Sequence, residues 1–361
     1  MKTLEESKSV CDPGPRICVI TRTKDRPLML KRAVESLLKQ SFEDWLHVIV
    51  NDGGDPAVLN SVVLPCLDAY RGRVKIINNP VSLGMQNASN CAIKEARSEY
   101  IAIHDDDDSW APSFLSECIQ YLDSTGPSSV IQGVATQSVW IFEEIDTHGN
   151  IVELRREDYF PFREVGLFNM AGKNIFPPIA FVYRRNVHDS IGLFDQEFNY
   201  LGDWDFNIRF LSKFDIGVID RQLAFYHWRQ KGASSNYANT VTDEVEEHLK
   251  LANKLRNHYL RLDLEKNRIG LGFVINMSEK FFQLMDREQP LIKRKKVLDW
   301  DAYDSAYNFW KEYKKKRMVR DEALNKIDER YGLRLFFTLY PFYKIAKPFR
   351  NLLRSFKKRI A

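Results

Sequence analysis

A chain of 361 residues with 44% hydrophobic residues is long enough for one large globular domain or two ordinary ones. Its formal net charge is only +4, which argues against the basic surface of a nucleic-acid-binding protein, so we expect no nucleic acid among its partners. The charge is uneven, because residues 331–361 hold eight Lys and Arg residues and no Asp or Glu, which leaves −4 for the rest of the chain.

Cysteine use and hydropathy bear on the compartment of the protein. The five cysteines are scattered and none forms a Cys-x-x-Cys pair, which indicates a reducing compartment and no zinc site. The N-terminal residues lack the apolar segment of a signal peptide, and no run of about 20 apolar residues is present to span a bilayer. We therefore expect a cytoplasmic protein, peripheral on the inner face of the cell membrane.

Strand-like and helical patterns alternate in the first hundred residues. Short apolar runs predict strands at 17–21, 45–50, 74–77 and 100–103. Apolar residues at helical spacing predict helices at 28–39, in the segment that ends near residue 70, and at 84–96. This alternation with short connections indicates an α/β fold, with a mostly parallel sheet, right-handed crossovers and flanking helices.

A run of four carboxylates, Asp105 to Asp108, follows the last of these strands. Like charges about 4 Å apart repel by about 4 kcal/mol at an effective dielectric constant near 20, so the run needs a bound cation or full solvation. One interpretation is a metal–diphosphate site, because Mg²⁺ and Mn²⁺ prefer oxygen ligands and Mg²⁺ is commonly held by one or two carboxylates and substrate phosphates. The other is a solvated acidic turn, in which Asp108 or Ser109 caps a helix that starts at Ala111.

Polar residues stand directly after three of the predicted strands. They are Thr21 and Arg22, then Asp52, and finally the acidic run. In open parallel sheets, ligands bind beyond the carboxyl ends of the strands, so these groups are expected to meet at one edge. This convergence favours the functional interpretation of the acidic run.

The second half of the chain changes character near residue 240. Strands are predicted at 139–142, at 176–183 beside Pro177 and Pro178, and at 225–230, and a helix opens at Asp203, where that side chain has the position of an N-cap. Helical patterns follow at 243–264 and 273–285. We therefore expect a catalytic domain over residues 1–240 and a helical C-terminal extension over 241–361.

Four segments of the chain, residues 17–27, 50–54, 100–110 and 202–209, resemble in order and spacing the conserved blocks of the family 2 glycosyltransferases. The resemblance covers about residues 17–235. It implies the GT-A fold, a Rossmann-type sheet, and inverting transfer from a nucleotide-diphosphate sugar, with a UDP-sugar as the expected donor.

The family pattern implies roles for single residues in donor and metal binding. Residues at the strand ends would bind the nucleotide sugar: Thr21, Arg22, Arg26, Asp52, Asp105 and Asp106. The DxD motif implies that Asp107 holds Mn²⁺ or Mg²⁺, together with Asp105 and His227. For His227, a packed position in the core is the alternative.

The pattern also implies roles on the acceptor side. Asp203 matches the aspartate that supplies the catalytic base, which takes the proton of the attacking hydroxyl. The preceding residue, usually Glu in the family, is Gly202 here, so Asp205 stays a second candidate for the base. Trp110 and Trp204 either bind the acceptor sugar or pack beside the cleft.

The basic C-terminal segment has the pattern of an amphipathic helix. Apolar and basic residues of 347–361 fall on different faces, as in helices that lie in the interface of an anionic membrane. The alternative is a helix docked on the body or on a second subunit of a homo-oligomer.

Taken together, these residues predict a metal-dependent inverting glycosyltransferase whose acceptor is a hydroxyl of a glycan or lipid-linked acceptor, in cell-surface polysaccharide synthesis. A nucleotidyltransferase with a similar sheet usually carries a glycine-rich basic loop after the first strand, and residues 21–27 contain no glycine. A further alternative is a glycosyltransferase-like glycan-binding or scaffold protein that has lost its chemistry, which Gly202 alone favours.

Overall fold

The computed structural model describes residues 14–198, 200–229, 245–267 and 269–294. Residues 1–283 form one compact unit and residues 284–361 form a second. The basic segment at 331–361 lies outside the described residues, so its membrane role stays a prediction. The predicted domain boundary near residue 240 also stays a prediction.

The described residues have an α/β fold with one mixed β-sheet of nine strands, in the order β3-β2-β1-β4-β8-β6-β9-β5, with β7 paired to β6. The first half, β3-β2-β1-β4, is parallel as predicted, and β8 then runs antiparallel between β4 and β6. The strands are β1 (Ile17–Thr23), β2 (Trp45–Asp52), β3 (Val74–Asn79), β4 (Tyr100–Ile103), β5 (Ser109–Trp110), β6 (Ile131–Ile145), β7 (Ile151–Asp158), β8 (Phe181–Arg184) and β9 (Asp215–Arg229).

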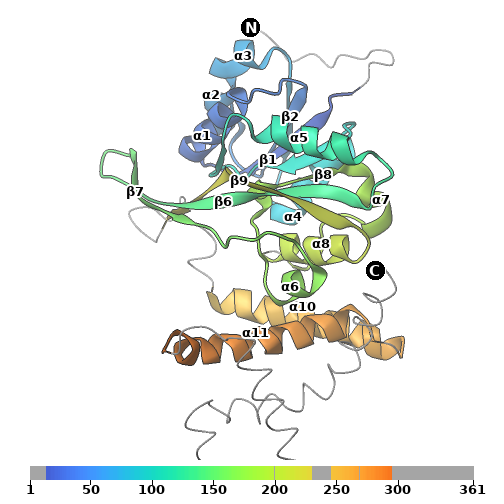
Figure 1. Cartoon of the computed structure of the whole chain (residues 1–361). Helices are drawn as coiled ribbons and strands as arrows, with labels where there is room; N and C mark the ends of the chain where they lie inside the picture. The colour runs from blue at the N-terminus through green and yellow to red at the C-terminus, as the bar shows by residue number, and fades with distance from the viewer. Residues whose placement is uncertain (1–13, 199, 230–244, 268, 295–361) are drawn as a thin grey trace, which may run out of the picture. The chain divides into compact units, whose positions relative to one another are not determined.

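Helices cover both faces of this sheet (Figure 1). The helices of the described residues are, in chain order, α1 (Pro27–Leu38), α2 (Pro56–Val63), α3 (Leu67–Tyr70), α4 (Met85–Glu95), α5 (Phe114–Thr125), α6 (Leu167–Gly172), α7 (His188–Ile191), α8 (Gly202–Leu211), α10 (Val245–Glu265) and α11 (Leu271–Arg294). Strand order moves outward from β1 to β3 and then returns to β4, so α4 crosses on the face opposite α1 and α2. The carboxyl ends of β1 and β4 therefore flank a topological switch point, where ligands of open α/β sheets bind.

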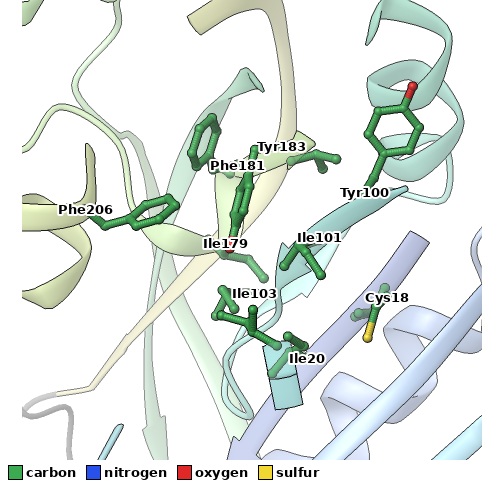
Figure 2. Packing of buried hydrophobic residues seen from close by; sticks show 14 of the residues in the cluster. Cys18, Ile20, Tyr100, Ile101, Ile103, Ile179, Phe181, Tyr183 and Phe206 are labelled. Carbon is green, nitrogen blue, oxygen red and sulfur yellow. The ribbon is translucent and has the colours of Figure 1, made fainter. Parts of the chain in front are cut away.

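The core lies on both sides of β4. Figure 2 shows Ile101 and Ile103 of β4 between Ile20 of β1 and the aromatic side chains Phe181 and Tyr183 of β8. All five side chains are at most 4% exposed, so β4 is fixed from both neighbouring strands. The loop that follows β4 therefore starts from a rigid position.

Three predicted element boundaries were wrong. The helix expected from Ala111 begins at Phe114, with Ser113 as its N-cap residue, and Ser109 and Trp110 form β5 instead. Pro178 opens a short 3₁₀ turn, so β8 starts only at Phe181; proline has no N–H to donate to a ladder. Helix α8 begins at Gly202, which places Asp203 inside the first turn rather than at the N-cap.

Helices α10 and α11 confirm the helical patterns predicted after residue 240. Leu255 and Tyr259 of α10 and Ile275 of α11 belong to the same buried cluster as the strands. Within the described part of the chain, the structure has no helix both long enough and apolar enough to cross a bilayer.

Candidate active site

The acidic run is buried, which excludes the solvated-turn interpretation. Asp106, Asp107 and Asp108 are 3%, 8% and 0% exposed. Asp108 caps no helix; its Oδ1 accepts a hydrogen bond from the backbone N–H of His227 at 2.9 Å. A tight turn, in which the N–H of Asp108 donates to the carbonyl of Asp105, folds the run beneath the end of β4. Three buried carboxylates and a fourth that is partly buried, in one turn, require neighbouring positive charge.

Arginines from the end of β1 supply part of that charge. Arg22 donates to Asp105 Oδ1 at 2.5 Å and to Ser89 Oγ of α4 at 2.7 Å. Arg26 donates to Asp106 Oδ1 and to Asp107 Oδ2, each at 2.8 Å. The predicted donor-loop arginines and the acidic run are therefore brought together at the switch point.

The hydroxyl of Thr21, however, is hydrogen-bonded to a neighbouring strand and not to the acidic run. Thr21 is fully buried, and its hydroxyl lies 2.9 Å from Nε2 of His47, whose Nδ1 lies 2.8 Å from the hydroxyl of Tyr70. Thr23, two residues further along β1, instead donates to Asp106 Oδ2 at 2.7 Å. In this structure the threonine beside the acidic run is Thr23.

Asp52 lies at the end of the neighbouring strand, β2, but its carboxylate is hydrogen-bonded to the loop that precedes α4. Its carboxylate accepts hydrogen bonds from the Asn79 amide and Ser82 hydroxyl, each at 2.8 Å, and from the N–H groups of Leu83 and Gly84. Burial acts to raise the pKa of Asp52, but these donors outweigh it and lower the pKa. Asp52 therefore shapes the turn that leads into α4, and its role in nucleotide binding stays a prediction.

Beneath the acidic run lies a second group of buried charges, which the sequence did not predict. Glu143 of β6 accepts from Arg32 of α1 at 2.8 Å, from Arg229 of β9 at 2.5 Å, and lies 2.8 Å from Nδ1 of His227. Arg229 also donates to Asp107 Oδ2 at 2.5 Å, and Arg32 donates to the backbone carbonyl of Asp107. Glu143 thus fixes two of the three arginines that hold Asp107.

Glu143→Gln is expected to lower the free energy of unfolding by about 3 kcal/mol, because removing one partner of a buried ion pair leaves the other charges unpaired. The carboxylate is 2% exposed, and bonds from His227 and Arg32 overcome the effect of burial and lower its pKa to about 2. Urea denaturation measures the loss. Glu153→Gln is the matched control, because its Arg156 pair is about half exposed and should contribute less than about 1 kcal/mol. Equal losses in the two variants would contradict this role.

The four aspartates of the run differ in their charge state. Burial acts to raise the pKa of Asp107, but Arg26 and Arg229 outweigh it and hold the pKa well below its usual range. Burial and the neighbouring carboxylates raise the pKa of Asp106 to about 6 and that of Asp108 well above its usual value. Asp107 is therefore the member of the run whose negative charge is most strongly stabilised.

Asp105 and Asp107 can also ligate a hard cation. Each gives one carboxylate oxygen to arginine, and the other oxygen accepts no hydrogen bond from the described residues. Among those residues, no three acidic, histidine or cysteine side chains form a complete metal cluster. Mg²⁺ sites with one or two carboxylates and substrate phosphates need no such cluster, so these two residues fit a site completed by a diphosphate. His227 fits less well, because Ser109 and Glu143 occupy its two ring nitrogens at 2.8 Å each.

Asp203 stands apart from the acidic run, in the first turn of α8. Its Oδ2 accepts a hydrogen bond from the Asn174 amide at 2.7 Å, and its side chain is partly exposed. Burial raises its pKa to about 6, and the charges of Arg22 and Asp105 act on it as well. A partly exposed carboxylate with a pKa near neutrality suits a general base.

Asp205, the second candidate for the base, is held in an ion pair. Its Oδ2 lies 2.6 Å from Arg209, and its Oδ1 accepts from the Tyr259 hydroxyl at 2.7 Å. The side chain is 1% exposed. These bonds give Asp205 a structural role in joining α8 to α10 and leave Asp203 as the better candidate.

Gly202 is explained by its neighbour on α4. A Cβ at this position would lie 2.3 Å from the side-chain Cδ of Gln86, which is buried. Gln86 therefore fills the space beside Asp203 where a larger residue at position 202 would lie. The residue that fills this space beside Asp203 is therefore a neutral amide, Gln86, and not a carboxylate.

Both predicted acceptor tryptophans are packing residues in this structure. Trp110 and Trp204 are each 4% exposed, and their indole N–H groups donate to the carbonyls of Ile179 and Met170. Trp110 also stacks on Phe114 with ring centroids 4.4 Å apart. Their rings offer no open face to an acceptor, so the alternative of packing beside the cleft is the one that the structure supports.

Comparison with known proteins finds glycosyltransferases. Residues 17–192 match the family model described as Glycosyl transferase family 2. The chain is 25% identical over 217 residues to the uncharacterized glycosyltransferase YwdF of Bacillus subtilis, covering 60% of this chain and 76% of that protein. It is 23% identical to a PGL/p-HBAD biosynthesis glycosyltransferase of Mycobacterium bovis, covering 80% of this chain and 98% of that protein.

A solved structure shares the fold. The mannosyltransferase PcManGT from Pyrobaculum calidifontis, in complex with GDP-Man and Mn²⁺, superposes with a TM-score of 0.51 at 14% identity. The match covers 87% of this chain and 86% of that chain. The expected GT-A fold is therefore confirmed.

Proposed function

Because this chain carries a domain of glycosyl transferase family 2, an enzyme family that transfers sugars from nucleotide-sugar donors, we propose that it moves the sugar, with inversion, to a hydroxyl group of a glycan or lipid-linked acceptor. We further propose cell-surface polysaccharide synthesis as its setting and a UDP-sugar as its donor. The observation that carries the proposal is the separation of Asp203 from the acidic run on different elements beside one switch point.

In the proposed reaction, Asp203 takes the proton of the acceptor hydroxyl as its oxygen attacks the anomeric carbon. The new carbon–oxygen bond forms as the bond to the diphosphate oxygen breaks, and the nucleoside diphosphate leaves with the electron pair. Mg²⁺ or Mn²⁺, held by Asp105 and Asp107, would act as a Lewis acid that neutralises the leaving diphosphate.

We propose that the nucleoside end of the donor lies beside the same edge. A small pocket between the ends of β1 and β2 is lined by residues that include Thr23, Asp25 and Asn51. Asp25 has a left-handed backbone, φ 51°, and its carboxylate accepts a hydrogen bond from the N–H of Asp55 at 2.7 Å. This bond ties the loop after β1 to the start of α2 and fixes the pocket.

The test is a panel of UDP-, GDP- and dTDP-sugars, each with and without Mn²⁺. We expect at least one to raise the melting temperature, because a ligand at 100 times its Kd stabilises the folded state by about 2.7 kcal/mol. We also expect slow release of the nucleoside diphosphate, increased by Mn²⁺. Stabilisation without any release, even with acceptors, would favour the glycosyltransferase-like binding protein instead. Neither effect with any donor would overturn the proposal.

A further inference from the structure

Four aromatic side chains gather on the part of the sheet formed by β6, β7 and β9. We call them the aromatic platform: Trp140, Tyr159, Phe160 and Tyr226. Trp140 of β6 lies opposite Tyr226 of β9 in the parallel register, so both rings project from the same face. The N–H of Tyr159 donates to the carbonyl of Ser138, which brings the segment after β7 alongside.

The rings form one continuous cluster. The ring of Trp140 is 4.9 Å from that of Tyr159 and 5.3 Å from that of Phe160, between centroids. The centroid of Tyr226 is 6.0 Å from that of Tyr159. Phe160 is 38% exposed, and the other three side chains are half-buried. A contiguous, partly exposed aromatic patch commonly marks a binding site.

Two consecutive residues connect this cluster to the proposed base. Nζ of Lys173 lies 3.1 Å from the ring centroid of Phe160, and the Asn174 amide donates to Asp203 at 2.7 Å. Since consecutive Cα atoms are about 3.8 Å apart, Phe160 of the platform and Asp203 both contact one short segment of the chain. Burial raises the pKa of Tyr159, and the carboxylates of Asp203 and Asp108 raise it further, which agrees with this proximity.

We propose that the aromatic platform binds a sugar ring of the acceptor and presents one of its hydroxyl groups to Asp203. A pyranose has a face of C–H groups and a rim of hydroxyls. Aromatic side chains match it, because the ring faces are apolar and the Tyr and Trp edges carry polar groups. The inference rests on the proposed function and assigns its acceptor side to residues other than Trp110 and Trp204.

The experiment is saturation-transfer NMR on the full chain with methyl glycosides of glucose, galactose, mannose and N-acetylglucosamine as probes. We expect saturation of the ring C–H protons of at least one probe, reduced at least fivefold in Tyr159→Ala and in Phe160→Ala. The matched control is Phe273→Ala, because Phe273 is 45% exposed on α11. It should leave the signal unchanged.

Release of nucleoside diphosphate from the donor, without acceptor, is measured on the same samples. Intact release in the two platform variants, with the NMR signal lost, is the expected result. No saturation of any probe in the unsubstituted protein, or equal saturation in the variants, would overturn the platform. Loss of donor turnover in the variants would overturn it as an acceptor site. Absence of donor turnover in the unsubstituted protein would count against the proposed function and leave the NMR result to decide the platform.

Discussion

Asp203→Asn is expected to lower kcat for sugar transfer by about 10³-fold, the order of magnitude that a general base contributes. Asparagine keeps the shape of the side chain and its contact with Asn174 but cannot take a proton. The Kd for the nucleoside diphosphate should stay within about twofold, because Asp203 lies on α8 and the donor residues lie on other elements. Initial rates and isothermal titration of the nucleotide measure the two effects.

The pH profile provides a second measurement of the same residue. Burial raises the pKa of Asp203 to about 6, and only the ionised form can accept a proton. Transfer by the unsubstituted enzyme should therefore be constant above about pH 7 and fall tenfold per pH unit below pH 6. In Asp203→Asn this dependence should disappear from the residual rate.

Asp205→Asn is the matched control, two residues away on the same helix. It breaks the buried pair with Arg209, so it should lower the free energy of unfolding by about 3 kcal/mol. Its kcat per folded molecule should change by less than about fivefold. A larger loss of kcat in Asp205→Asn than in Asp203→Asn would reverse the assignment of the base.

Asp107→Asn is expected to reduce transfer by about 10³-fold or more, because Lewis-acid stabilisation of the leaving group supplies several kcal/mol and each 1.36 kcal/mol is a factor of ten. The variant also removes the negative charge that Arg26 and Arg229 share. Nucleotide affinity measured with and without Mn²⁺ is the decisive readout. In the unsubstituted protein Mn²⁺ should increase the affinity, and in Asp107→Asn this increase should be lost.

The control for this variant is Asp220→Asn, an exposed aspartate on β9. It should keep both the transfer rate and the effect of Mn²⁺. If Mn²⁺ still increased nucleotide affinity in Asp107→Asn, the metal would be held elsewhere. If Mn²⁺ had no effect on the unsubstituted protein, the arginines around Asp107 would be the main partners of the diphosphate.

Local sequence patterns predicted the residues of the site that lie at the ends of strands. The acidic run follows β4 directly, and Arg22 lies at the end of β1, so alternation of strands and helices was enough to place them at one edge. Arg26 was predicted from the family resemblance alone. Parallel strands end at the same edge whatever their exact register. These residues required no knowledge of distant contacts.

The buried charges beneath the run depend on long-range pairing. Glu143 meets His227 only because β6 and β9 pair in a parallel register that sets Ile141 opposite His227. Nothing near Glu143 in the sequence signals that pairing. One local signal existed: Arg32 lies one turn from the buried Met29 on the helix that covers the sheet, where a charged side chain needs a partner.

Side-chain direction was the other property that the sequence could not provide. Trp110 and Trp204 were placed beside the cleft by their motifs, but carbonyl acceptors from Ile179 and Met170 draw their indoles inward. The platform residues Trp140 and Tyr226 stand on strands without any motif. The connection between the platform and Asp203 runs through Phe160 and the segment that carries Lys173 and Asn174.

The bond between Tyr259 and Asp205 has a practical consequence for exchanging parts between related enzymes. The helix that bears the proposed base is braced by a side chain from α10, well past residue 192, where the family match stops. Leu255 of α10 is fully buried in the same cluster. A chimera joined just after β9 would remove this brace, so a segment that is transplanted into a related enzyme should extend through α10.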